Sequence, residues 1–176
     1  MIPLPGSHNI RPYQTTWPVY RGDKPVAFRP DGDSGRHLVP SRNYVLLRRF
    51  SAKEERRRLT ASWFLDGGGP PRFLALQNHI IYIYHCNREL ATAEAYGLTV
   101  IFNSTLLDRY FRMLSGSTQV NATEIRSIHF PDLDRVAAIG RWIEDSGERR
   151  PARIEEVVYD HLGIAPSLRD SVRCPA

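Results

Sequence analysis

The sequence has too few cysteines for a disulfide framework. Its 176 residues include only Cys86 and Cys174, which lie far apart and lack the paired spacing of a zinc site. No run approaches the roughly 18 consecutive apolar residues of a membrane-spanning helix. The N-terminus lacks a basic stretch followed by an apolar one, so no secretory signal can be read. These absences favour free thiols, no membrane contact and a cytoplasmic protein.

Apolar content is nevertheless sufficient for a folded core. Hydrophobic residues make up 41% of the chain and 18 residues are aromatic, which excludes a wholly disordered protein. The length is that of one domain with extensions. We expect a domain over residues 1–145, with residues 146–176 forming a C-terminal helix and tail.

Lysine is scarce and the basic residues are clustered. Of 24 basic residues 22 are arginine, the side chain that binds phosphate oxygens and guanine edges in a bidentate manner. Residues 42–58 carry seven basic and two acidic residues, an excess equal to the net charge of +5. A GC-rich genome is an alternative explanation for the high share of arginine. A solvated strand edge and helix face is the alternative explanation for the basic segment. The clustering favours a polyanionic partner.

The pattern of apolar and turn residues predicts an α+β fold. We expect a twisted, mostly antiparallel sheet from the first half, packed against helices from the second half. Strands are expected at residues 44–50, 72–76 and 80–84, with the last two forming a hairpin or lying adjacent. Residues 53–59 are expected to turn helical after Ser51, with Glu54 completing a capping box.

The second half has helical periodicity. Helices are expected over residues 89–102, over 105–114 after an N-cap at Ser104, from 133 after an N-cap at Asp132, and over 154–162. The polar run Ser115-Gly116-Ser117-Thr118-Gln119 predicts a loop, residues 124–130 a short strand, and the tail from Pro166 a loosely held end.

Several catalytic and metal-binding patterns fail on inspection. The glycines at 67–69 are followed by two prolines instead of a helix, so a plain turn is favoured over a cofactor loop. Asp132 and Asp134 lack a nearby lysine, which argues against a metal-dependent nuclease. His79, His85 and Cys86 lack the tight spacing of zinc ligands, and no nucleophile elbow occurs. No catalytic residue, metal site or bound cofactor is therefore expected.

The sequence does nominate contacts for a nucleic acid. Phosphate contacts are assigned to Arg48, Arg49, Arg56, Arg57 and Arg58, and groove contacts to Ser115, Gly116, Ser117, Thr118, Gln119 and Asn121, with Asn78 and His79 as lower-ranked candidates. If the five arginines each neutralise a phosphate, the binding constant should fall with salt at a log–log slope of about −4 to −5.

Four strings resemble one protein family: NYVLLRRFSAKEERRR at 43–58, NHIIYI at 78–83, FNSTLLDRYFR at 102–112 and SGSTQVNATEIR at 115–126. They are similar to the C-terminal target-recognition region of adenine-specific DNA methyltransferases of type II restriction-modification systems. The Asn-Ser helix end and the Ser-Gly-Ser-Thr-Gln loop also resemble recognition domains of type I specificity subunits. The resemblance covers roughly residues 9–145.

The resemblance implies sequence-specific binding of double-stranded DNA beside a catalytic domain that methylates adenine from S-adenosylmethionine. The sequence departs from the family in two respects. It contains no Asn-Pro-Pro-Tyr or Asp-Pro-Pro-Tyr string, the family's catalytic signature, and a doubly wound cofactor-binding sheet cannot be drawn from it. We therefore expect the chain alone to be non-catalytic, with S-adenosylmethionine bound only by a catalytic partner or a missing domain. The alternative is a protein-interaction module that docks a methyltransferase or another restriction-system subunit through its basic face.

Overall fold

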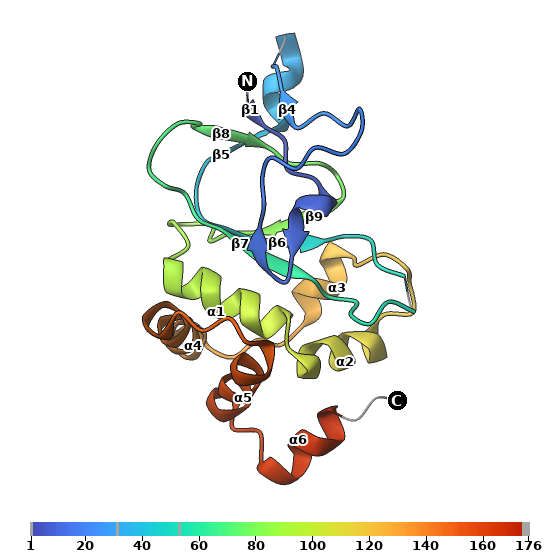
Figure 1. The fold of residues 1–176 in the computed structure, drawn as a ribbon, viewed down its shortest axis with the longest axis vertical. Coiled ribbons are helices and arrows are strands. Elements are labelled where there is room, and N and C mark those ends of the chain that lie inside the picture. The colour runs from blue at the N-terminus through green and yellow to red at the C-terminus, as the bar shows by residue number, and fades with distance from the viewer. Residues whose placement is uncertain (1, 31, 53, 174–176) are drawn as a thin grey trace.

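A computed structural model describes residues 2–30, 32–52 and 54–173 (Figure 1). The first half contributes short strands and two 3-10 turns, and the second half contributes helices, which confirms the α+β prediction. The strands are β1 Ile2–Pro3, β2 Ile10–Arg11, β3 Tyr13–Thr15, β4 Ala27–Phe28, β5 Leu38–Pro40, β6 Tyr44–Arg48, β7 Ala61–Phe64, β8 Phe73–Ala75 and β9 Ile80–Ile83. The helices are α1 Thr92–Phe102, α2 Thr105–Leu114, α3 Ala122–Ser127, α4 Leu133–Ser146, α5 Pro151–Leu162 and α6 Pro166–Arg173.

The main sheet has five strands in the order β2-β3-β7-β6-β9. The β3–β7 pair is parallel and the other pairs are antiparallel, which confirms a mostly antiparallel sheet. Two small sheets, β1-β4 and β5-β8, lie above it in Figure 1, and the helices lie below. The expected pairing of the last two strands is wrong, because β8 pairs with β5 and β9 pairs with β6.

Strand β6 is buried on both faces. Val45 and Leu47 belong to the core shared with the helices, while Tyr44 and Leu46 belong to a second, smaller core with Leu74. Side chains alternate along a strand, so one strand serves both cores. The central position of β6 fixes the starting point of the basic segment that follows it.

Helices α1 and α4 approach each other very closely. A Cβ atom on Gly97 would lie 2.0 Å from the carbonyl oxygen of Val136, and one on Gly140 would lie 1.7 Å from that of Ala93. Only glycine fits at both positions. The contact locks α4 against α1, which itself packs on β7 and β6.

The helix predictions at α1, α2, α4 and α5 are confirmed, including the N-caps at Ser104 and Asp132. Two other predictions are wrong. Residues 124–127 belong to helix α3 and not to a strand, because Asn121 and Glu124 form a capping box at its start. The described part of the tail, Pro166–Arg173, forms α6, which Arg169 ties to α5 through ion pairs with Glu156 and Asp160.

The helix expected at residues 53–59 is also wrong for its described part. Residues 54–59 form turns and bends. The amide nitrogens of Arg58 and Leu59 donate to the carboxylate of Asp108, at 2.6 and 2.9 Å, instead of to helical carbonyls. Lys53 lies outside the described residues. The described part of the segment between β6 and β7, residues 49–52 and 54–60, therefore runs along α2 without forming a helix of its own. We call this segment the excursion.

Candidate nucleic-acid interface

The polar loop after α2 pairs with the basic segment after β6. The amide of Val120 donates to the carbonyl of Arg49 at 2.7 Å, and the amide of Ser51 donates to the carbonyl of Thr118 at 3.3 Å. Between these two bonds, Phe50 and Gln119 form an antiparallel bridge. Residues 49–51 and 118–120 thus form a short two-stranded unit, which we call the ribbon.

A third predicted segment joins the ribbon. The amide of Arg49 donates to the carbonyl of His79 at 2.9 Å, and the Arg49 guanidinium donates to the carbonyl of Asn78 at 3.2 Å. The rings of Phe50 and His79 lie edge to face with centroids 5.0 Å apart. Three segments that the sequence nominated separately therefore meet at one place.

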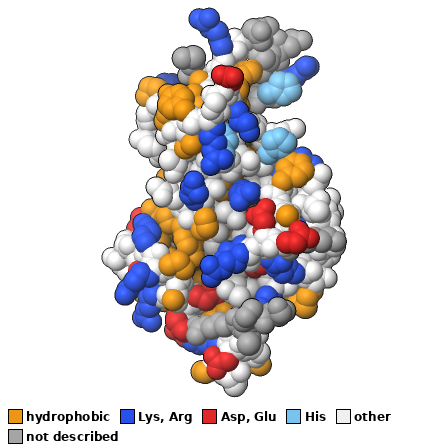
Figure 2. All heavy atoms as spheres, turned by 45° about the vertical axis from the view of Figure 1, so that its right-hand side comes forward, with side chains coloured by type: hydrophobic (Ala, Val, Ile, Leu, Met, Phe, Trp, Pro, Cys, Tyr) orange, Lys and Arg blue, Asp and Glu red, His pale blue; other side chains and the backbone are white. Residues whose placement is uncertain are grey.

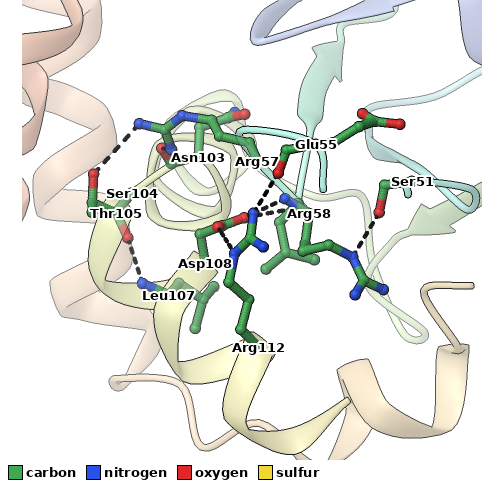
Figure 3. Close-up of polar contacts among 11 residues, drawn as sticks. Ser51, Glu55, Arg57, Arg58, Asn103, Ser104, Thr105, Leu107, Asp108 and Arg112 are labelled. Atoms are coloured by element: carbon green, nitrogen blue, oxygen red, sulfur yellow. Dashed lines mark hydrogen bonds and ion pairs between the residues drawn. The ribbon is translucent and has the colours of Figure 1, made fainter. Parts of the chain in front are cut away.

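Arg58 supports the ribbon from beneath. Arg58 is 2% exposed, and its side chain donates to the Ser51 hydroxyl at 3.0 Å (Figure 3) and to the carbonyl of Ser117. Its guanidinium also lies over the ring of Phe111, 5.8 Å from the centroid. One buried cation thus connects both sides of the ribbon to α2.

Asp108 fixes the chain that carries Arg58. Besides accepting the amides of Arg58 and Leu59, its carboxylate accepts a bond from Arg112 Nε at 2.8 Å. Arg112 also donates to the carbonyl of Glu55 at 2.6 Å, so two residues of α2 hold the excursion at several points (Figure 3). The base of the ribbon is therefore rigidly connected to a helix whose other face is in the core.

The five arginines nominated for phosphate contact have different surroundings. Arg49 and Arg56 are exposed. Arg48 is half-buried, with its guanidinium 3.8 Å from the Glu55 carboxylate. Arg57 is half-buried and donates to the carbonyl of Asn103 at the end of α1. Arg58 is buried and bonded within the protein, so its guanidinium is not on the surface in this structure.

The polar loop also divides into surface and anchor positions. Gly116, Ser117, Thr118 and Gln119 are exposed. Ser115 is 5% exposed and ends α2, and the Asn121 side chain accepts the Thr123 amide at the start of α3. The exposed part therefore comprises residues 116–119 and Asn121, with Val120 buried between them, and helix caps hold both ends of the loop.

The surroundings of the ribbon are mixed in charge. Figure 2 shows Lys and Arg side chains along the length of this side of the molecule, with most of the visible Asp and Glu side chains in its lower half. An apolar groove of about 400 Å³ lies between β9 and α3 and carries Tyr82, Tyr84 and Arg126 on its wall.

No cluster of three metal-ligating side chains occurs among the residues described. No helix in the described part of the chain has the length and apolar character of a membrane span.

Sequence reasoning missed two members of this site. Phe50 was assigned only to a strand, although an aromatic residue between Arg49 and Ser51 is a visible signal of a mixed apolar and basic surface. Asp108 lies in the first turn of α2 and was assigned no role. No sequence pattern relates it to residues fifty positions earlier, so its role depends on tertiary structure alone.

The chain has relatives among curated proteins. It is 34% identical over 163 residues to the type II methyltransferase M.PstI of Providencia stuartii, and the alignment covers 93% of this chain and 32% of that protein. It is 33% identical over 147 residues to the type II methyltransferase M.BsuBI of Bacillus subtilis, covering 81% of this chain and 29% of that protein. The chain is homologous to one part of type II methyltransferases.

The chain spans about a third of the length of these relatives. The relationship supports a restriction-modification context. No protein-family model matches the chain, and no solved structure matches it either.

Proposed function

We propose that this chain is the part of a type II methyltransferase that binds double-stranded DNA and recognises the target sequence. The ribbon is the observation that carries the proposal. It brings an exposed arginine, an exposed aromatic ring and exposed polar side chains onto one rigid support. The major groove of B-DNA admits a two-stranded β-ribbon, and specificity there comes from polar and apolar contacts to base edges. The homology to type II methyltransferases supports DNA as the ligand.

We assign different contacts to the nominated residues according to their exposure. Arg49 and Arg56 are exposed and bind phosphates, which position the domain. Ser117, Thr118 and Gln119 are exposed on the ribbon side of the loop and contact base edges. The side chains of Asn78 and His79 lie beside the ribbon and contact the DNA backbone or a neighbouring base. Gly116 is exposed in the same loop.

Four nominated residues act through the others. Arg58 holds Ser117, Arg57 holds the end of α1, Ser115 ends α2 and Asn121 begins α3. We assign Arg58, Ser115 and Asn121 to positioning the loop, and Arg57 to positioning the segment that carries Arg58. Arg48 stays close to Glu55 and contributes less to phosphate binding than a free arginine, because the carboxylate offsets its charge.

Catalysis belongs to another part of the methyltransferase in this proposal. S-adenosylmethionine binds there, and the present chain supplies the site preference. The chain alone is then a DNA-binding protein without methyl-transfer activity. A calorimetric titration of the chain with S-adenosylmethionine tests the assignment of cofactor binding to another part of the protein. No heat of binding is expected, and saturable binding would contradict the assignment.

The DNA-binding proposal is tested by the salt dependence of affinity. The protein is incubated with a randomised duplex pool, bound DNA is sequenced, and the affinity for the enriched duplex is measured between 50 and 200 mM salt, a range of about 0.6 in log concentration over which phosphate contacts are strongly weakened. We expect an enriched short motif and a negative log–log slope. The combined change of Arg49→Gln and Arg56→Gln should reduce the slope by about 2, since each phosphate contact contributes about 0.9.

The matched control changes Arg135→Gln and Arg141→Gln, two exposed arginines on α4. It removes the same net charge and should leave the slope largely unchanged. Equal effects of the two double variants would show that binding follows overall charge and not the ribbon. Absence of DNA binding by the wild-type chain would favour the protein-docking alternative.

A further inference from the structure

Phe50 and Gln119 occupy a special position within the ribbon. The hydrogen bonds flank them, from Ser51 to Thr118 and from Val120 to Arg49, so the two residues form a non-hydrogen-bonded antiparallel pair. In such pairs the Cα atoms are about 4.5 Å apart and both side chains lie on the same face of the ribbon. An aromatic ring and a carboxamide are therefore presented side by side.

Both side chains are available to a ligand. Phe50 is 39% exposed although it is a large apolar residue. Gln119 is exposed, and within the described residues its side-chain amide makes no hydrogen bond with the protein; only its backbone amide does, to the Ser117 hydroxyl at 3.0 Å. The pair thus combines an unused donor and acceptor with an unused apolar surface.

This combination matches the major-groove edge of an A·T base pair. Adenine presents N7 as an acceptor and N6 as a donor, which a glutamine amide meets with two hydrogen bonds, and thymine presents a C5-methyl group to apolar side chains. G·C pairs carry no methyl group there. We propose that Phe50 and Gln119 together recognise an A·T base pair, with Gln119 on the adenine and Phe50 on the thymine methyl group. The inference rests on the proposed DNA-binding function.

The supports of the pair favour a specific contact over an adaptable one. The Phe50 ring packs on the His79 ring, and the backbone on both sides of the pair is held by hydrogen bonds. Arg58 holds Ser51, which follows Phe50, and Ser117, which lies two residues before Gln119. A backbone held in this way loses little freedom on binding, so the positions from which the two side chains reach the bases are fixed and the contact can discriminate between bases.

The test combines protein variants with modified bases at each A·T position of the selected duplex. Deoxyuridine removes the thymine methyl group, and 7-deazaadenine removes the adenine N7 acceptor. At one position, deoxyuridine should weaken wild-type binding about fourfold, the loss expected for one buried methyl group, and should have no effect on Phe50→Ala. At the same position, 7-deazaadenine should weaken wild-type binding about fivefold and have no effect on Gln119→Ala.

Cross-combinations give the control. Phe50→Ala should still respond to 7-deazaadenine, and Gln119→Ala should still respond to deoxyuridine. Phe73→Ala and Gln14→Ala change an exposed phenylalanine and an exposed glutamine outside the ribbon, and both should behave as wild type. Phe50→Leu keeps an apolar side chain and should retain part of the methyl response, and circular dichroism confirms that each variant is folded.

Each result decides between the claims. A selected site without an A·T pair overturns the inference and leaves the DNA-binding function standing. The same is true if Phe50→Ala and Gln119→Ala remain as sensitive to the modified bases as the wild type. If the wild-type chain binds no duplex, the proposed function itself fails and the inference fails with it.

Discussion

Replacement of Arg58 by alanine tests how the ribbon is supported. The Arg58 side chain is buried and donates to the Ser51 hydroxyl and to the Ser117 carbonyl. Hydrogen bonds from a charged group contribute about 1.5–3 kcal/mol each, and an acceptor left unsatisfied in the interior costs about 1–3 kcal/mol. Water entering the space left by the side chain offsets part of the loss. We expect the free energy of unfolding to fall by about 3–5 kcal/mol from the loss of these two hydrogen bonds.

The same change should alter DNA recognition. Without Arg58, Ser117 and Ser51 lose the cation that connects them, so the loop residues 116–119 lose their fixed position. At a temperature where Arg58→Ala remains folded, affinity for the selected duplex should approach that for a scrambled duplex. Phosphate contacts by Arg49 and Arg56 would persist, and non-specific binding should therefore survive.

The measurements are thermal unfolding and competition binding. For a chain of this length each kcal/mol lowers the melting temperature by about 2–4 °C, so a decrease of about 10 °C is expected. Arg56→Ala is the control, because Arg56 is exposed and close in sequence, and surface changes usually stay within about 0.5 kcal/mol. A melting temperature for Arg58→Ala equal to that of Arg56→Ala, together with unchanged site preference, would refute the support role.

Three further predictions concern the framework that carries the ribbon. Gly140→Ala should destabilise the fold by about 3 kcal/mol in urea unfolding, because its Cβ would overlap the Ala93 carbonyl; wild-type stability would contradict the close helix contact. Asn103→Ala should cost about 2–3 kcal/mol, because the buried amide bonds both backbone groups of a β7 residue; a change below about 0.5 kcal/mol would contradict it. The Arg88 guanidinium holds the pKa of Glu94 below its ordinary value of 4.5, so this stabilisation is complete above that value and is lost as the pH falls through the lowered pKa. Glu94→Gln should therefore unfold with a weaker dependence on pH as the pH falls below 4.5, and an unchanged pH profile would argue against the ion pair.

Sequence patterns predicted the elements whose signals are local. Strand β6 has the apolar and β-branched residues of a buried strand, and α2 and α4 have apolar stripes and capping residues. The failures occurred where distant residues decide the outcome. Residues 54–59 resemble the start of a helix, and the Glu55 carboxylate does accept the Ala52 amide as in a capping box. Asp108 takes the next amides away from helical bonding.

The candidate site was predicted in its location more than in its details. The basic segment, the 78–79 turn and the polar loop were nominated separately, and the structure joins them through backbone hydrogen bonds that no sequence pattern specifies. Chain direction and burial then separate the arginines. Arg58 lies only two residues from Arg56, yet the Arg58 side chain is buried and the Arg56 side chain is exposed. The difference arises because Asp108 of α2 holds the backbone of Arg58.

The central claim is that the ribbon reads a DNA sequence. Its most direct test is the ratio of affinities for the selected and scrambled duplexes, measured by fluorescence anisotropy for the wild type and for a triple variant, Ser117→Ala, Thr118→Ala and Gln119→Ala. We expect the triple variant to lose most of this ratio while it keeps its affinity for scrambled DNA and its melting temperature. An unchanged ratio in a folded triple variant would contradict the claim.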